Sequence, residues 1–160
     1  MTIDAAHFRR ALGRFASGVT VVTMAFGEEV SGITVSAFAS LSLNPPLVLV
    51  CIDKSSSTLG LIRRGKSFAV NILASDQRDL SNHFASKQPD KMAGIPHRVG
   101  QLGNPILHGT QANLECVLRE EFDGGDHFIL IGEVHAVEVD EAKTPLLYYS
   151  SQYGSFEALT

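Results

Sequence analysis

Residues 31–46 have the sequence SGITVSAFASLSLNPP, which combines strand-forming residues with many small polar ones. The pattern predicts one extended strand, then a loop, and then a stop at the double proline, which cannot donate ladder hydrogen bonds. Gly32, Thr34, Ser36 and Ser40 occupy alternating positions, so one face of the strand is narrow and rich in hydroxyl groups. Such a face lets a planar polar ligand approach the backbone. The alternative is the edge of a barrel, where small residues only relieve crowding.

The chain before this stretch predicts a helix followed by a hairpin. Residues 4–16 form the predicted helix, because four apolar residues repeat at i, i+3, i+4 and i+7: Phe8, Ala11, Leu12 and Phe15. Asp4 and Gly18 are its expected caps. Residues 19–25 are β-branched and predict a strand, and the turn at residues 27–29 joins it to the 31–46 stretch as a hairpin.

The chain after the double proline predicts an apolar strand at residues 47–53, which contains Cys51 and ends on Asp53. Lys54 follows, then four consecutive hydroxyl residues, 55–58, stand before a short predicted helix at 59–65. One interpretation is ordinary helix capping, which needs only one hydroxyl. The other is a phosphate site, built from hydroxyls, free N–H groups, the helix dipole and the charge of Lys54. The run of four hydroxyls favours the phosphate site.

The second half of the chain predicts further strands around one more helix. Asn71 lies inside a predicted strand at 67–73 and needs a hydrogen-bond partner there. A helix at 75–85, capped by Ser75, precedes a long loop at 86–111 of the kind that often forms a functional lid. The remaining predicted elements are a strand from 112, a turn at 120–125, strands at 126–139 and 145–149, and an aromatic tail.

Composition limits the class of protein. The chain has 160 residues, a net charge of −4 and a pI near 5.8, so it predicts one domain, residues 1–160, that does not bind nucleic acid. It has no apolar run of the ~20 residues that cross a bilayer and no secretion signal at its start, so we expect a cytoplasmic protein that does not enter membranes. Cys51 and Cys116 are expected to be free thiols. The His and Cys residues show no metal-ligand spacing, so no metal site is expected.

The order of the predicted elements favours a mainly β fold. Two or three helices and six or seven strands, mostly joined by short turns, indicate a closed or nearly closed antiparallel barrel with helices at its ends. Regular βαβ alternation and a GxGxxG motif after a strand are both missing from the sequence. A bound nucleotide is therefore not expected to be held in the dinucleotide-binding manner.

Several segments together resemble the short-chain flavin reductases, the reductase components of two-component flavin-dependent monooxygenases. They are FRRALGRFASGVTVVT at 8–23, GITVSAFASLSLNPP at 32–46, SFAVNIL at 67–73, GDHFILIGEV at 125–134 and the tail at 146–154. The resemblance implies the FMN-binding split-barrel fold: an antiparallel, Greek-key-like split β-barrel with a few short flanking helices. The chain departs from the family pattern at Lys91-Met92, where many relatives have a basic–aromatic pair. It also departs at residues 150–152, where relatives often have a glycine-rich run.

The resemblance also implies roles for individual residues. Residues expected to line the flavin ring are Thr34, Val35, Ser36, Ala37, Ser40 and Cys51. Residues expected to hold the ribityl chain and phosphate are Asp53, Ser55, Ser57 and Thr58, with Phe84 and Ala85 closing over them and Tyr153 shaping the pocket. His127 of the Gly-Asp-His motif is the expected catalytic residue, beside the ring and the nicotinamide. A histidine at the start of a strand is otherwise most often a turn or surface residue.

The function implied by the resemblance is an NAD(P)H:flavin oxidoreductase. It transfers hydride from NADH or NADPH to FMN or FAD, supplies reduced flavin to a partner monooxygenase, and forms a homodimer. Such chemistry depends on positioning and exclusion of water, and needs no metal or protein nucleophile. Two alternatives remain at this point: an enzyme like the pyridoxamine-phosphate oxidases, and a flavin-binding module without turnover. The residues leave open the choice between FMN, FAD and riboflavin, and between NADH and NADPH.

Overall fold

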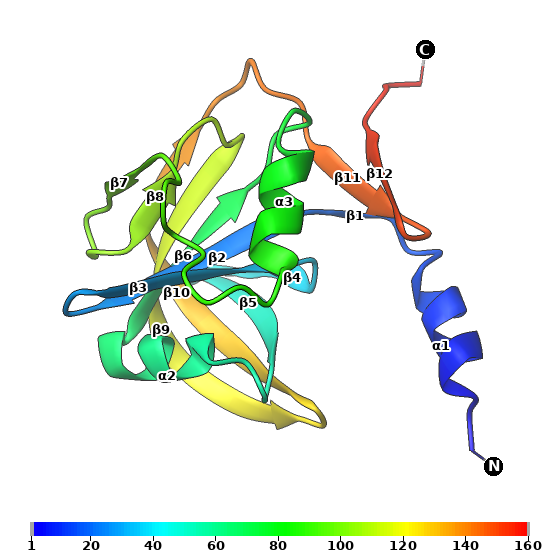
Figure 1. The fold of residues 1–160 in the computed structure, drawn as a ribbon, viewed down its shortest axis with the longest axis horizontal. Helices are drawn as coiled ribbons and strands as arrows, with labels where there is room; N and C mark the ends of the chain where they lie inside the picture. The colour runs from blue at the N-terminus through cyan, green and yellow to red at the C-terminus, as the bar shows by residue number, and fades with distance from the viewer. Residues whose placement is uncertain (1, 160) are drawn as a thin grey trace.

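The computed structural model describes residues 2–159, which form mainly β-strands with three short helices (Figure 1). The first half of the chain contains α1 (Ala5–Leu12), β1 (Ser17–Gly18), β2 (Thr20–Phe26), β3 (Glu29–Val35), β4 (Phe38–Leu43), β5 (Pro46–Asp53), α2 (Thr58–Gly65) and β6 (Ser67–Ile72). The second half contains α3 (Arg78–Ala85), β7 (His97–Val99), β8 (Pro105–Leu107), β9 (Ala112–Gly124), β10 (His127–Val139), β11 (Leu146–Tyr149) and β12 (Gln152–Ser155). None of these three helices is long and apolar enough to span a membrane.

Seven strands form one antiparallel sheet in the order β3-β2-β6-β9-β10-β5-β4. Strands β3 and β4 lie at opposite edges of this sheet, although only Ser36 and Ala37 separate them in sequence. The sheet must therefore curl until its two edges meet at this corner. There the Phe38 amide donates to the Ser36 carbonyl (2.9 Å) and the Cys51 amide donates to the Ala37 carbonyl (3.0 Å).

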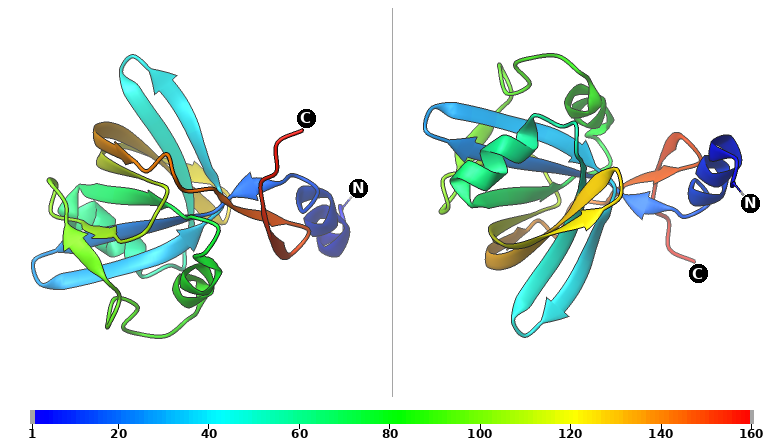
Figure 2. Two further views of the ribbon diagram at one scale, coloured as in Figure 1. Left: turned by 90° about the horizontal axis from the view of Figure 1, so that it is seen from above. Right: turned by 90° about the horizontal axis from the view of Figure 1, so that it is seen from below.

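Away from the corner, the β2–β3 and β4–β5 hairpins diverge (Figure 2). Nowhere in residues 2–159 does a ladder join β3 to β4, so the barrel is open rather than closed. The predicted mainly β, antiparallel architecture with a few short helices is confirmed. The prediction of one extended strand followed by a loop within residues 31–46 is wrong, because the chain breaks at Ser36 and Ala37 and then forms a second strand, β4, at the other edge of the sheet.

Strand β2 has both faces buried, because successive side chains of a strand point to opposite sides. Val22 and Met24 belong to one apolar cluster, with Phe68 of β6 and residues of α2. Val21 belongs to a second cluster, which contains Phe84 of α3. Helices α2 and α3 therefore cover opposite faces of the sheet at β2.

A buried polar network holds the segment between α3 and β9. The Asn71 side chain accepts a hydrogen bond from the Leu107 amide of β8 (2.9 Å), and its amide group donates to the Val21 carbonyl (3.0 Å) and the Thr23 hydroxyl (2.9 Å). The expected partner for Asn71 is thus confirmed. Its bond to Leu107 holds strand β8, which the sequence did not predict within the 86–111 loop.

A second, three-stranded sheet in the order β1-β11-β12 stands apart from the main body, with α1 beyond it (Figures 1 and 2). The hairpin between β11 and β12 turns at Ser150 and Ser151, whose φ angles of 47° and 64° are unusual for residues with a side chain. Helix α1 buries none of its residues, and the side chains of Phe8 and Phe15 are 52% and 83% exposed.

Several predicted boundaries are corrected. Asp4 caps α1 as expected, accepting from the His7 amide (2.7 Å), but Gly13 rather than Gly18 is the C-cap. Helix α3 begins at Arg78, not at Ser75. The turn predicted at 120–125 is wrong: β9 continues to Gly124, and Glu121 on it pairs with Arg63 of α2.

Candidate flavin site

Three adjoining cavities surround Thr34 at the end of β3, where the two edges of the sheet meet. The serine cavity, about 570 Å³, is lined by Ile33, Thr34, Asp53, Ser55, Ser56, Ser57, Ala85, Ser86, Lys87, Gln88 and Lys91. The corner cavity, about 200 Å³, is lined by Ile33, Thr34, Val35, Ser36, Ala37, Cys51, Ile52, Asp53 and His127. The tyrosine cavity, about 290 Å³, is lined by Val19, Thr34, Ser36, Ser81, Asn82, Ala85, Tyr148 and Tyr153.

The serine cavity contains a turn rich in hydrogen-bond donors. Asp53 accepts from the amide (2.7 Å) and the hydroxyl (2.6 Å) of Ser55, and these two bonds hold the pKa of the Asp53 carboxyl below its usual value. The Ser56 and Thr58 hydroxyls bond each other (2.7 Å). Ser57 occupies the N-cap position of α2 without using its side chain as a cap. The Ser57 hydroxyl, beside the N-terminus of α2, therefore remains available to an anion.

The positive charge of this cavity comes from different lysines than expected. Lys54 points away from the serines: its ammonium pairs with Asp123 on the neighbouring hairpin (2.5 Å) and lies 4.9 Å from the centre of the Phe128 ring. Lys87 and Lys91, from the segment after α3, line the cavity instead. Sequence reasoning missed both, because only the tertiary fold brings residues 86–91 opposite residues 55–57.

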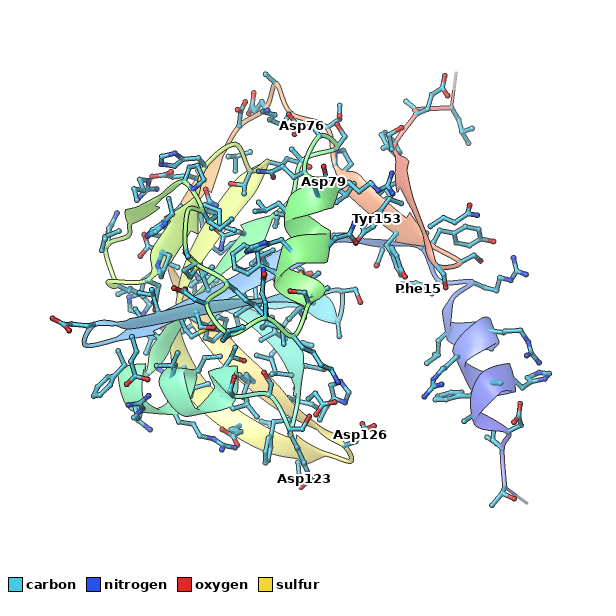
Figure 3. The ribbon with its side chains drawn as sticks, viewed as in Figure 1. Phe15, Asp76, Asp79, Asp123, Asp126 and Tyr153 are labelled. Carbon is cyan, nitrogen blue, oxygen red and sulfur yellow. The ribbon has the colours of Figure 1, made fainter. Side chains whose placement is uncertain are left out.

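His127 opens β10 and reaches the corner cavity from the hairpin tip that carries Asp123 and Asp126 (Figure 3). It lies opposite Asp53 in the β5–β10 ladder. Its Nδ1 atom is 2.7 Å from the Asp126 carboxylate. Because a carboxylate only accepts, Nδ1 carries a proton in this pair. The Asp126 carbonyl accepts from the Lys54 amide (3.0 Å), so the tip is fastened to the end of β5.

The tyrosine cavity joins the small sheet to α3. The Tyr153 hydroxyl lies 2.9 Å from the Ser81 hydroxyl and donates to the Asn82 side chain (2.9 Å). The Thr34 hydroxyl donates to the Ser81 carbonyl (2.6 Å), which fastens the edge of β3 to the same helix. Tyr153 therefore lines a cavity beside the corner, and its hydroxyl bonds the protein.

Not every expected residue lines a cavity. The structure brings Thr34, Val35, Ser36, Ala37, Cys51, Asp53, Ser55, Ser57, Ala85, Tyr153 and His127 together around the corner. Ser40 lies on β4 outside these cavities, and Thr58 is buried in the first turn of α2. Phe84 is fully buried and packs under Gly32, where a Cβ atom would lie 2.6 Å from the Phe84 ring.

The donor set of these cavities fits a flavin. A phosphate would find hydroxyls and a helix N-terminus on one wall of the serine cavity and two lysines on the other. A flat ring would find the exposed residues Ser36 and Ala37 in the corner cavity, with Cys51 and His127 beside them. Within residues 2–159, no group of three or more His, Cys, Asp or Glu side chains could hold a metal ion.

The chain matches the protein family described as "Flavin reductase like domain" over residues 12–157, and it belongs to this family. It is 43% identical over 157 residues to the reductase subunit HsaB of a flavin-dependent monooxygenase from Mycobacterium tuberculosis, covering 97% of this chain and 84% of that protein. It is 40% identical to an NADH-dependent flavin reductase from a Rhodococcus species, covering 96% of this chain and 87% of that protein.

A solved structure shares the fold. The NADH:FAD oxidoreductase SgcE6 from Streptomyces globisporus, in complex with NAD and FAD fragments, superposes with a TM-score of 0.92 at 35% identity. The match covers 96% of this chain and 93% of that one. The resemblance stated from the sequence is thereby confirmed at the level of the family.

Proposed function

We propose that this protein is an NAD(P)H:flavin oxidoreductase that reduces FMN or FAD by hydride transfer and supplies reduced flavin to a partner monooxygenase. The main structural support for this proposal is the pair of cavities that meet at Thr34. One suits a phosphate, and the other suits a ring beside His127. Family membership and the reductase relatives support this proposal. Flavin, when bound, supplies the hydride acceptor.

The residues of the chain bind and position the reactants. The Ser55–Ser57 turn and the α2 N-terminus hold the phosphate, while Val35 to Ala37, Cys51 and Asp53 form the wall against the ring. The Nδ1–H group of His127 donates a hydrogen bond to Asp126. From this position His127 orients the nicotinamide carboxamide or supplies positive charge beside the ring. Holding donor and acceptor in contact away from water is the main contribution to rate.

Steady-state consumption of NADH and of NADPH, each with FMN, FAD and riboflavin, tests this function. Protein-dependent oxidation of reduced nicotinamide that requires added flavin supports the proposal. Tight flavin binding without oxidation would instead indicate a storage or sensing module. A pyridoxamine-phosphate-oxidase-like enzyme would oxidise its phosphorylated amine substrate and leave NADH unchanged.

The proposal includes a C2 homodimer, the commonest closed symmetry. An isolated helix shorter than ~12 residues is marginal in water, yet α1 has eight residues and buries none of them. The exposed Phe8 and Leu12 of α1, and the exposed Phe15 that follows the helix, need an apolar partner. Leu12 and Phe15 also line a cavity of about 420 Å³ with Phe38, and this cavity shares Ala37 and Cys51 with the corner cavity. A second copy covering α1 would therefore border the ring wall.

Sedimentation velocity tests the dimer. Wild-type protein at micromolar concentration is expected to sediment as a dimer, and Phe15→Asp is expected to sediment as a monomer with reduced activity. Phe26→Asp, which changes a phenylalanine on the β2–β3 hairpin that is 44% exposed, against 83% for Phe15, is the control and should remain dimeric. A fully active wild-type monomer would contradict the proposed assembly.

We further propose that the chain is one domain. The two apolar clusters share strand β2, and the family match spans residues 12–157. A single cooperative unfolding transition, seen alike by fluorescence and by circular dichroism, would support this proposal. Two separate transitions would contradict it.

A further inference from the structure

The imidazole of His127 has few side-chain contacts of its own. In the part of the chain that the structure describes, its one hydrogen bond goes to the carboxylate of Asp126. The side chains of His127 and Asp126 are 41% and 91% exposed, and an exposed ion pair of this kind restrains its members weakly. The place of the imidazole in the corner cavity therefore depends on how the tip of the β9–β10 hairpin is held.

The backbone of this tip is rich in glycine. The chain turns through Gly124 and Gly125, and Gly125 has a φ of 88°, which a residue with a side chain rarely adopts. A Cβ atom at Gly125 would meet nothing within 4 Å, so no neighbour packs against the turn at this point. The tip therefore needs contacts from outside the hairpin to keep one orientation.

Lys54, the residue that follows β5, supplies three such contacts. Its amide donates to the Asp126 carbonyl (3.0 Å), and its ammonium pairs with Asp123 (2.5 Å) and lies 4.9 Å from the centre of the Phe128 ring. The Asp123 carboxylate also accepts from the amide of Gly125 (3.1 Å), so the ion pair reaches the turn itself. The Lys54 ammonium and then the Gly125 amide hold the pKa of the Asp123 carboxyl below its usual value.

These side-chain contacts lie on the face of the hairpin away from the corner cavity. Phe128 pairs with Asp123 across the β9–β10 ladder, and successive side chains of a strand point to opposite faces. His127 lines the corner cavity, whereas Phe128 packs against the apolar cluster that includes residues of α2. Lys54 therefore holds the tip from behind His127.

Arg63 of α2 contacts the same ring but a different part of the hairpin. Its guanidinium lies 4.7 Å from the centre of the Phe128 ring and pairs with Glu121. Glu121 lies opposite Leu130 in the ladder, farther from the turn. Arg63 thus fixes the body of the hairpin, and Lys54 fixes its tip.

Building on the function proposed above, we propose that Lys54 is a positioning residue for hydride transfer, because it fastens the hairpin tip and so determines where His127 lies beside the nicotinamide. Lys54 lines none of the three cavities at the corner. Its loss is therefore expected to change NADH kinetics through His127 and to leave flavin binding unchanged.

Steady-state kinetics with NADH and FMN test this role. Lys54→Met is expected to lower kcat/KM for NADH by about threefold, the scale of one surface ion pair, and to divide the loss between kcat and KM as His127→Ala does. Lys54→Arg should retain the wild-type value, because it keeps the charge. Asp123→Asn should reproduce the loss, because it removes the ion pair but keeps an acceptor for the Gly125 amide.

A double-mutant cycle separates positioning from a general structural effect. Adding Lys54→Met to His127→Ala should lower kcat/KM no further, because Lys54 acts through the imidazole. Arg63→Met, which removes the cation from the other side of the Phe128 ring, is the matched control and should keep wild-type kinetics. An equal loss from Lys54→Met in both backgrounds, or an equal loss in Arg63→Met, would contradict the proposed role of Lys54.

The outcomes distinguish this inference from the function beneath it. Wild-type protein that binds flavin but does not oxidise NADH would overturn both. Normal wild-type activity, slowed by His127→Ala but not by Lys54→Met, would overturn only the role of Lys54. Weaker FMN binding in Lys54→Met, measured by fluorescence titration, would also overturn that role, because it would assign the lysine to the flavin site.

Discussion

The serine cavity and the corner cavity share Ile33, Thr34 and Asp53, but they differ in chemistry. The serine cavity has hydroxyls, a helix N-terminus and two lysines without acidic partners among the described residues. The corner cavity has small exposed residues, a thiol and one imidazole. The difference teaches that affinity for a phosphorylated flavin and the rate of hydride transfer depend on separate groups. Each can therefore be changed with little effect on the other.

The largest expected effect comes from the serine cavity. Replacing both Ser55 and Ser57 with Ala should weaken FMN binding by tenfold or more, because each charge-assisted bond contributes roughly 1.5–3 kcal/mol. Riboflavin binding, measured by the same titration, should change little. Ser40→Ala, a serine outside the cavities, is the control. Equal losses for both ligands would mean that the hydroxyl run is only a helix cap.

The corner cavity is tested by His127→Ala. The change should lower kcat/KM for NADH by about tenfold, the scale of one lost hydrogen bond, while flavin affinity stays near the wild-type value. His135→Ala removes an exposed histidine from the same strand and should have no kinetic effect. Unchanged NADH kinetics, or unfolding of the His127 variant, would show that the histidine is structural.

The two cysteines sharpen the comparison between the corner cavity and the core. Both are free thiols, as predicted. Cys51 is half-buried and lines the corner cavity. Cys116 is fully buried in the core, and this burial raises the pKa of its thiol to about 12. Since the thiolate reacts, alkylation of Cys51 should rise with pH by about tenfold per unit below its raised pKa. Saturating flavin should slow that reaction, and Cys116 should react only after unfolding. An alkylation rate for Cys51 that is the same with and without flavin would show that the flavin ring does not bind in the corner cavity.

The smallest effect lies outside both cavities, in the β11–β12 turn. Ser151→Gly should stabilise the fold by about 0.5–1 kcal/mol in urea unfolding, because glycine adopts the positive φ of this position without strain. Ser150→Gly should gain less, because the Ser150 hydroxyl donates to the Gly13 carbonyl (3.4 Å). Flavin binding should not change in either variant. A loss of stability in Ser151→Gly would show that the turn is not strained.

Local pattern was enough to predict much of the fold. Asp4 caps its helix, the turn at Gly27 makes the β2–β3 hairpin, and the apolar runs in β5 and β6 are strands, because short-range spacing and turn chemistry determine each of them. Strand β8 could not be found in this way. It has three residues, and its place depends on the side chain of Asn71, which is far away in sequence.

The same limit applies to the site. The hydroxyl run at 55–58 is visible in the sequence, and the structure places three of its members in one cavity wall. The source of the positive charge in this cavity could not be predicted from the sequence. Lys54 directly precedes the hydroxyl run, but its ammonium pairs with Asp123 on the β9–β10 hairpin. Lys91 lies at the cavity, and its contacts with His83 and with the Phe84 carbonyl at the end of α3 hold it there.

The most direct test of the account is anaerobic mixing of the protein with one equivalent of FMN and one of NADH. The visible absorbance of FMN is expected to bleach at a rate set by protein concentration, with one NADH consumed for each FMN reduced. The Ser55/Ser57 double variant should need more FMN to reach that rate, and the His127 variant should bleach slowly at every FMN concentration. Bleaching no faster than in buffer alone, with FMN shown to be bound, would contradict the proposed hydride transfer.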